Sequence, residues 1–347
     1  MEMINLLIMS ALILIFPIFW SLFFGISKKE SIEKTGRILF FDYLKGLSII
    51  SVIIIHTFGF ITTSFKYTET GVDLINNILR FAIPFFFIVS GILLNPDTKN
   101  QLKKFYNRKV VRLATPYTLC VIVIAFYFEK NFIEFLKMFI TGEGAVPYYF
   151  FIILFQFYLI YPFLVKIKDR KWFLILSFLF SIIFFLIPQT WKILGVPFFG
   201  KYLFFFAYGI SKRNYFLNNI PNKKETVQWL FLIFIFVVLL IVNPAKYYNV
   251  RLIYGVTLFN MFFILKDKIN LRKYFNLLII KFGQNSLWIF LIHYLIVRVL
   301  GENLSKQSLW IYSTSLIIPS IILSYWLAKL LDHLYKLGID RLQKNSH

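Results

Sequence analysis

Cysteine, histidine and acidic residues are scarce in this sequence. Its 347 residues include one cysteine, four histidines and 16 aspartates and glutamates. A single cysteine, Cys120, excludes a disulfide framework and a metal site of paired cysteines, and we expect no bound metal. Charged residues make up 16% of the chain, whereas a soluble domain carries roughly a quarter. The sequence therefore lacks the polar surface of a soluble protein.

The signatures of several enzyme and transporter classes are also missing. The chain contains no GxxxxGKS or GxxxxGKT phosphate loop, no HExxH zinc motif and no GxSxG nucleophile motif. The sequence therefore gives no support to soluble hydrolase chemistry or to transport driven by nucleotide hydrolysis.

Long apolar runs dominate what is present. The chain is 59% hydrophobic and 20% aromatic, with a mean hydropathy of +0.72. An apolar helix of about 20 residues, rising ~1.5 Å per residue, crosses a hydrocarbon core of ~30 Å. We therefore predict an all-α, polytopic integral membrane helix bundle of about eleven transmembrane helices. Their expected ranges are 4–26, 38–64, 74–94, 110–128, 147–165, 172–188, 193–210, 227–243, 248–265, 277–300 and 309–331.

Basic residues alternate between the loops that join these runs. One set of loops holds 24 lysines and arginines, and the other holds 6. Because basic residues accumulate in cytoplasmic loops, the first set is predicted to be cytoplasmic, with the N-terminus outside and the C-terminus inside. The net charge of +22 is then a topology signal that also favours anionic membrane lipids, and no nucleic-acid partner is expected. The basic set is 27–37, 95–109, 166–171, 211–226, 266–276 and 332–347. The other set is 65–73, 129–146, 189–196, 244–250 and 301–308.

The first apolar run reads as a retained helix rather than a cleaved signal peptide. Glu2 precedes it, Lys28 and Lys29 follow it, and no small-x-small cleavage site ends it. We expect 1–36 to be an additional N-terminal helix with a basic loop, and 37–347 to form one membrane domain.

Ionisable residues inside membrane helices are costly and therefore candidates for function. The second predicted helix contains Asp42, Lys45 and His56, which share one face, with His56 roughly 16 Å beyond Lys45. His293 lies in a later helix at a similar expected depth, so the two histidines could share a site. Simpler interpretations stay open, because Asp42 and Lys45 can neutralise each other at three-residue spacing and a buried neutral histidine is common.

Basic residues also gather near the third and fourth helices. Arg108, Lys109 and Arg112 suit phosphate groups, with Lys109 and Arg112 three residues apart on one face. Ordinary anchoring at the membrane surface is the alternative for this cluster. Arg80 lies in the third helix near its outer end, where an anionic or sugar substrate, or Asp73, is a suitable partner.

Four segments follow a further pattern. The first is a basic residue separated by ten others from a histidine, and the second is an aromatic stretch ending in Ser-Gly. The third is a K-x-x-R pair, and the fourth is a late G-x-x-S-L segment ending in histidine. The matching residues are, in order, Arg37, Asp42, Lys45, Gly46 and His56; Pro84 to Gly91; Lys109 and Arg112; and Gly283, Ser286, Leu287 and His293. Together they resemble the membrane-bound acyltransferase family 3, the O-acyltransferases that modify bacterial surface glycans. The resemblance covers nearly the whole chain from Arg37 on. At two positions lysine replaces the family's frequent arginine, which keeps the charge but loses bidentate geometry.

The resemblance implies an acyl-CoA donor, usually acetyl-CoA, on the cytoplasmic side and a glycan acceptor, lipid-linked or at the cell surface, facing outward. It implies no tightly bound cofactor and a multi-pass protein of the bacterial cytoplasmic membrane. His56 would be the general base or a transient acyl carrier, with His293 the second candidate for the base. The expected catalytic residues are His56, Asp42 and His293, and the expected substrate-binding residues are Lys45, Arg37, Arg80, Arg108, Lys109, Arg112 and Ser286.

Two other functions stay open. A glycan exporter or flippase without acyl-transfer chemistry would favour inverted repeats with paired broken helices, and no convincing repeat is visible. A membrane glycosyltransferase that uses a lipid-linked sugar needs a carboxylate on an outer loop, for which Glu143 is the candidate. The segment before it, 129–141, has apolar residues at helical spacing and is expected to lie along the outer interface.

Overall fold

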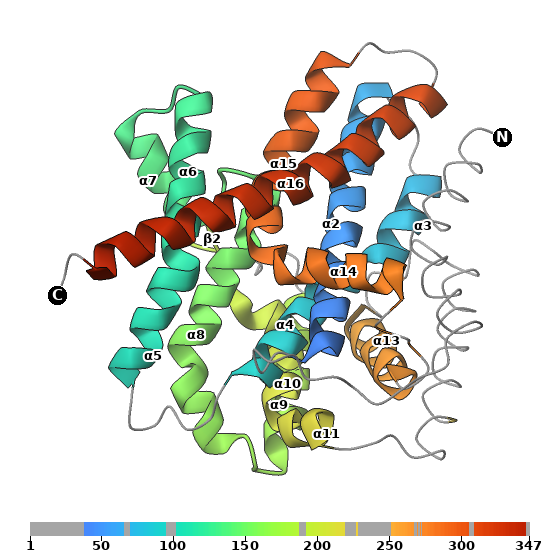
Figure 1. Cartoon of the computed structure of the whole chain (residues 1–347). Coiled ribbons are helices and arrows are strands. Elements are labelled where there is room, and N and C mark those ends of the chain that lie inside the picture. The colour runs from blue at the N-terminus through green and yellow to red at the C-terminus, as the bar shows by residue number, and fades with distance from the viewer. Residues whose placement is uncertain are drawn as a thin grey trace. The chain divides into compact units, whose positions relative to one another are not determined.

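The chain is described here by a computed structural model, shown in Figure 1. The residues that the structure describes are 38–65, 70–94, 102–186, 192–218, 227, 251–266, 269, 271, 273–304 and 309–344. The predicted helices at 4–26 and 227–243 lie outside this set, apart from Val227. Within it the regular structure is helical except for one two-stranded antiparallel hairpin.

The elements keep the labels of Figure 1. In the first part of the chain they are α2 (Leu39–Phe65), α3 (Thr70–Leu79), α4 (Ala82–Leu93), α5 (Leu102–Lys109), the π-helix η2 (Val110–Ala114), α6 (Thr115–Tyr127), α7 (Phe132–Thr141), the short 3-10 helix η3 (Val146–Tyr148) and α8 (Tyr149–Ile167). They continue with α9 (Trp172–Leu186), β1 (Lys192–Ile193), β2 (Val196–Pro197), the 3-10 helix η5 (Phe199–Tyr202), α10 (Leu203–Ser211), α11 (Arg213–Asn218), α13 (Arg251–Ile264), α14 (Tyr274–Gln284), α15 (Ser286–Asn303) and α16 (Leu309–Lys344).

The described residues divide into two compact units. The first is drawn from Ser31–Ile75 and Leu271–His347 and contains α2, α14, α15 and α16; the second is Asn76–Asn270. The first unit is therefore discontinuous in the chain, because the whole second unit lies between its two halves.

Helix α2 is the central element of the first unit. Its hydroxyl side chains bond the carbonyl four residues back: Ser48 at 2.8 Å, Ser51 at 2.9 Å and Thr57 at 2.8 Å. Because these hydroxyls are satisfied within their own helix, they add little cost to an element that is otherwise apolar and buried in a membrane protein.

Helix α14 crosses α2 in backbone contact (Figure 1). A Cβ atom added to Gly46 would overlap the Ile279 carbonyl, and one added to Gly283 would overlap the Asp42 carbonyl. Glycine is therefore the only residue that fits at either position, as is usual where membrane helices approach closely.

Beyond this crossing, α15 follows α2 in the same direction. His56 of α2 packs on His293 of α15, and the Phe60 ring lies where a side chain on Gly301 would go, so the contacts advance in step along both helices. Helix α16 returns in the opposite direction, because its early Tyr312 packs on Phe65 and its later residues pack on α14 and α15. Helices α2 and α15 are thus parallel, and α16 is antiparallel to both.

The second unit is held by aromatic packing and a second glycine contact. A Cβ atom on Gly209 of α10 would overlap the Ile88 carbonyl of α4. Phe157 of α8 stacks on Phe206 of α10 with ring centroids 4.4 Å apart, and Phe87 of α4 meets Phe157 edge to face. The core of this unit therefore consists of close-packed rings.

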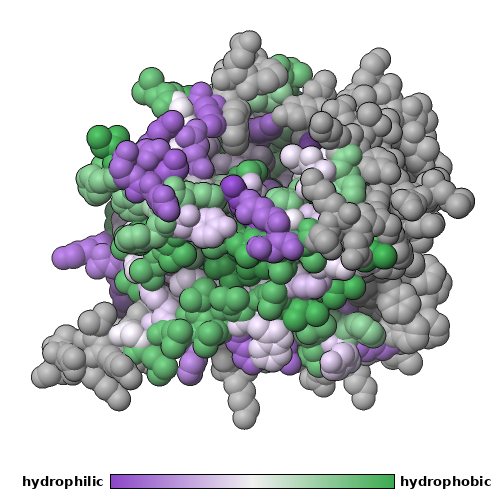
Figure 2. Space-filling model, turned by 90° about the horizontal axis from the view of Figure 1, so that it is seen from above, coloured by the Kyte–Doolittle hydropathy of each residue, from purple (hydrophilic) through white to green (hydrophobic). Residues whose placement is uncertain are grey.

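Six described helical segments are long and apolar enough to cross a membrane. They are Leu39–Phe65, Ile75–Leu93, Leu102–Tyr127, Val146–Ile167, Ser286–Asn303 and Ile311–Gly338. Two shorter apolar helices, Trp172–Leu186 and Leu252–Ile264, occupy two more of the expected runs. Apolar side chains are exposed on many of these helices. In Figure 2, green residues lie beside purple ones over the part of the visible face that is not drawn in grey. The protein is thus a multi-pass helical membrane protein.

Two expected spans are wrong in detail. The run 193–210 is not one helix, because a hairpin turn at Leu194 and Gly195 is followed by a 3-10 turn, leaving α10 only nine residues long. The run 277–300 divides into α14 and α15 at Asn285. In both cases the run is apolar on average, and average hydropathy does not indicate a change of chain direction.

We expect Gly46→Ala to destabilise the protein by about 3 kcal/mol, because the new methyl group must displace the α14 backbone rather than a flexible side chain. Thermal unfolding in detergent measures this effect. Gly59→Ala, in the same helix but with no atom within 4 Å of the added carbon, is the matched control and should be neutral or slightly stabilising. Equal unfolding temperatures for the two variants would contradict the packing argument.

Candidate functional site

The two histidines of the predicted membrane helices lie side by side in the first unit. The ring centroids of His56 on α2 and His293 on α15 are 5.3 Å apart, with an angle of 44° between the ring planes. The parallel packing of α2 and α15 brings the two rings to the same level. The structure therefore brings together the two histidines for which the sequence predicted a similar depth.

His293 is fully buried, and its ring is fixed by its own helix. Its Nδ1 lies 3.0 Å from the Ile289 carbonyl oxygen. Since a carbonyl only accepts, Nδ1 carries the hydrogen, and the other nitrogen of the neutral ring is an acceptor. This Nε2 is buried and has no hydrogen-bond partner in the described part of the chain. The site therefore contains a buried imidazole nitrogen that has no hydrogen-bond partner among the described residues.

His56 is the more accessible member of the pair. Its residue is partly exposed, whereas His293 is 0% exposed. The Tyr294 ring packs edge-on against His56 at 5.6 Å, and Phe290 packs against His293 at 5.7 Å. Of the two histidines, only His56 therefore has accessible surface.

Asp42 and Lys45 form the local ion pair that their spacing allows. Lys45 Nζ lies 2.5 Å from Asp42 Oδ1, with the two side chains 23% and 7% exposed. The second carboxylate oxygen, Asp42 Oδ2, is buried and has no partner among the described residues. The pair is thus self-neutralising but keeps an acceptor oxygen at the α2–α14 crossing. Ser286, the first residue of α15, is also buried in this unit.

The basic cluster of the second unit spans two elements: Arg108 and Lys109 end α5, and Arg112 lies in the π-helix η2. Pro116 has no N–H to donate to the Arg112 carbonyl, and the Thr115 N–H instead bonds the Val110 carbonyl five residues back. Lys109 folds over the Tyr158 ring, with Nζ 4.3 Å from its centre, while Arg112 is exposed.

Arg108 is exposed and donates from Nε to the Lys104 carbonyl at 3.3 Å. Arg80 is partly buried at the turn between α3 and α4, so the third predicted helix is bent at this residue. Arg37 lies outside the described residues.

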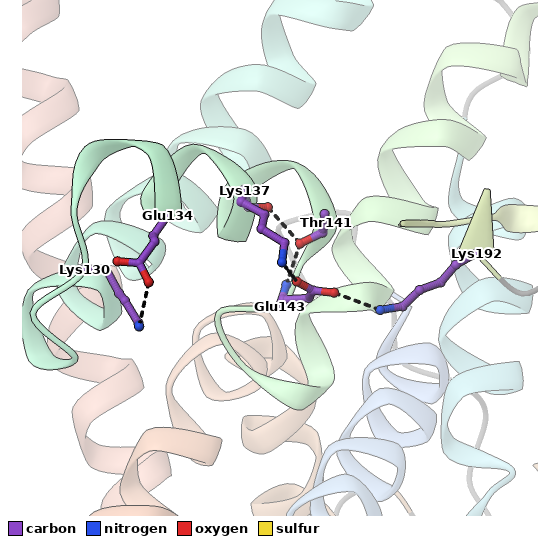
Figure 3. Close-up of polar contacts among 6 residues, drawn as sticks. All are labelled: Lys130, Glu134, Lys137, Thr141, Glu143 and Lys192. Atoms are coloured by element: carbon purple, nitrogen blue, oxygen red, sulfur yellow. Dashed lines mark hydrogen bonds and ion pairs between the residues drawn. The ribbon is translucent and has the colours of Figure 1, made fainter. Parts of the chain in front are cut away.

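Glu143, the loop carboxylate considered for glycosyl transfer, is bound by two lysines. Its Oε1 lies 3.0 Å from Lys192 Nζ, and its Oε2 lies 3.5 Å from Lys137 Nζ (Figure 3). The hydrogen bond from Lys192 lowers the pKa of this carboxyl below its usual range. Both oxygens are engaged in holding the loop, so the geometry does not favour a catalytic role for Glu143.

Sequence reasoning did not single out Tyr294, which packs against His56. Its signal in the sequence is a polar aromatic residue directly after His293 in an apolar helix. The two glycines of the α2–α14 crossing, Gly46 and Gly283, were noted only as motif positions, and their packing role emerges from the structure.

One comparison with known proteins identifies a relationship. A family model described as an acyltransferase domain, that of acyltransferase family 3, matches residues 38–329. The match includes every described element from α2 to the Pro319-containing part of α16. Among curated proteins and among solved structures, none matches the chain at a significant level.

We expect Lys45→Met to destabilise the protein by about 3 kcal/mol, because it leaves the buried Asp42 carboxylate without a counter-charge. The double variant Lys45→Met, Asp42→Asn should recover most of this loss, since both charges are then removed. Thermal unfolding of the three proteins in one detergent measures the coupling.

Lys336→Met is the control, because the Lys336–Asp332 pair on α16 is exposed and should contribute less than about 1 kcal/mol. If the double variant unfolds at the same temperature as Lys45→Met alone, the Asp42 carboxylate does not need Lys45 to neutralise its charge, and the argument is contradicted.

Proposed function

The chain belongs to acyltransferase family 3, and on that premise we propose that it transfers an acyl group, acetyl in the first instance, from acyl-CoA to a hydroxyl group of a cell-surface or lipid-linked glycan. The observation that carries this proposal is the contact between His56 and His293 inside a membrane helix unit. Two buried or half-buried histidines in contact are costly in an apolar bundle, and proton transfer is the chemistry that this residue type supplies.

The proposed reaction needs one base. His56 accepts the proton of the acceptor hydroxyl while the oxygen attacks the carbonyl carbon of the thioester. The tetrahedral oxyanion then collapses with cleavage of the C–S bond, and the departing CoA thiolate takes the proton back from His56. The products are the acylated glycan and free CoA, so atoms and charge balance without a cofactor.

His293 is proposed to orient His56 rather than to meet the substrate. It is 0% exposed, its Nδ1 is held by the Ile289 carbonyl, and its unpartnered Nε2 can accept a hydrogen from a neighbouring donor. An N–H of His56 is the nearest chemical candidate, at a ring separation of 5.3 Å. Accepting that hydrogen would leave the other nitrogen of His56 free to act as the base.

The basic residues are proposed to bind the donor. Lys45 near the start of α2, and Arg37, Arg80, Arg108, Lys109 and Arg112, supply the positive charge that the phosphates of CoA need. Their position at the predicted cytoplasmic ends of helices, Arg80 excepted, supports a donor from the cytoplasm. The proposed location is the bacterial cytoplasmic membrane, with the acceptor on the opposite side.

We expect His56→Ala to reduce acyl transfer by about 10²- to 10⁴-fold, the usual contribution of a general base, and His293→Ala to cause a smaller loss. The assay is transfer of radiolabelled acetyl from acetyl-CoA into a glycan fraction, in membranes that carry each variant at equal abundance. His333→Ala, which removes an exposed histidine of α16, is the control and should keep full activity.

The outcomes separate the candidate functions. Full activity of a folded His56→Ala protein would exclude its role as the base, whatever the family assignment. No transfer by the unaltered protein, with several acyl-CoA donors and cell-envelope glycans, would favour a glycan exporter without acyl-transfer chemistry.

A further inference from the structure

Helix α7, in the second unit, has three distinct sides. At about 100° per residue, the exposed apolar residues Phe132, Ile133, Leu136 and Ile140 fall within an arc of roughly 100°. Lys137 and Glu134 follow on the next arc, and Phe135, Met138 and Phe139 form the third, which is buried or half-buried. A helix with one side for protein, one for water and one for a further apolar phase is suited to a membrane interface.

The connections of α7 place it at that interface. It is separated from the candidate span Leu102–Tyr127 by 128–131 and from the span Val146–Ile167 by 142–145, too short for it to leave the membrane surface. Both ends are capped: Asn131 and Glu134 form a capping box, and Gly142 ends the helix with φ of +70°. Tyr117 of α6 donates to the Phe139 carbonyl at 2.9 Å, which fixes the buried side.

The β1–β2 hairpin has an exposed leucine at its turn, a position at which a water-exposed hairpin usually has a polar residue. Leu194 and Gly195 form its two-residue turn, with φ of +52° and +81°. A turn of this kind prefers Asn-Gly, and a left-handed leucine costs about 1–2 kcal/mol. Yet Leu194 is 98% exposed, so no contact within the described chain offsets this cost.

Glu143 joins the hairpin to α7. It pairs with Lys137 of α7 and with Lys192 of β1 (Figure 3). The base of the hairpin is fixed to α8 by Gln156, which donates to the Pro197 carbonyl at 2.7 Å and accepts from the Phe199 N–H at 3.0 Å. The ion pairs of Glu143 therefore connect the hairpin and α7 into one continuous surface.

The charges of this surface balance. It carries three lysines and three glutamates, namely Lys130, Lys137, Lys192, Glu129, Glu134 and Glu143. The apolar side chains, rather than attraction to anionic headgroups, must therefore supply its affinity for lipid.

From these observations we propose that α7 and the β1–β2 hairpin form a single interfacial anchor, in which the apolar side of α7 and Leu194 enter the boundary between headgroups and acyl chains of the leaflet opposite the basic loops. The lysine–glutamate pairs remain on its aqueous side. The occupant of this apolar surface is lipid, because both of its connections lead directly into membrane spans. Since the charges cancel, the anchor enters zwitterionic and anionic membranes equally.

The test uses spin labels on the full-length protein in nanodiscs, in a Cys120→Ser background that keeps a hydrogen-bonding group beside Tyr148. Labels are placed at Ile133→Cys, Leu194→Cys and, as the adjacent control on the water side, Glu134→Cys. We expect the first two labels to be accessible to oxygen and shielded from a water-soluble nickel chelate, and the third to show the reverse. The pattern should be the same in phosphatidylcholine and in phosphatidylcholine with phosphatidylglycerol.

Aqueous accessibility at Ile133 or Leu194 equal to that at Glu134 would overturn the anchor. Coupling through Glu143 is tested by the mobility of the label at position 194. Glu143→Gln should increase this mobility, whereas Glu134→Gln, which removes a charge within α7 alone, should leave it unchanged. An equal response to the two substitutions would show that the hairpin and α7 are independent surfaces.

Discussion

The close contact between α2 and α14 is the constraint on which the first unit depends. Gly46 and Gly283 let two helix backbones meet without side chains between them, and this contact sets the register of everything that follows along α2. In that register α15 runs parallel to α2, and His56 and His293 arrive at the same level. A slip of one residue would rotate the two rings apart by about 100°. The chemistry proposed for the histidines thus rests on two residues that have no side chain.

Polar groups in this protein are accommodated locally wherever the helix allows it. The hydroxyls of Ser48, Ser51 and Thr57 bond their own helix, and Asp42 pairs with Lys45 one turn away. A hydrogen-bond partner within the same helix satisfies a polar group without a tertiary contact, which is an advantage in a membrane, where water is absent. Asp42 Oδ2 and His293 Nε2 are among the buried polar atoms that have no hydrogen-bond partner within the described residues, and both lie in the unit that carries the proposed catalytic residues.

The sequence predicted the features that are governed by hydropathy and by spacing along one helix. The membrane character, six of the spans, the Asp42–Lys45 pair and the association of the two histidines all follow from such patterns. Changes of direction inside apolar runs could not be predicted in this way, because the turn at Leu194 and the break before Ser286 leave the mean hydropathy high. The π-helix escaped prediction for a similar reason: its cause is one missing N–H, at Pro116.

The discontinuity of the first unit has a consequence for its biosynthesis. The roughly 240 residues between Gly46 and Gly283 take about 10–50 s to synthesise at ~5–20 residues per second, so α2 enters the membrane long before α14 and α15 exist. During that interval Asp42 and Lys45 have no ion-pair partner from α14 or α15, and each is neutralised by the other. Because Asp42 and Lys45 are three residues apart and form an ion pair, they add no net charge to a nascent α2. This pairing lowers the cost of keeping α2 in the bilayer before α14 and α15 are synthesised.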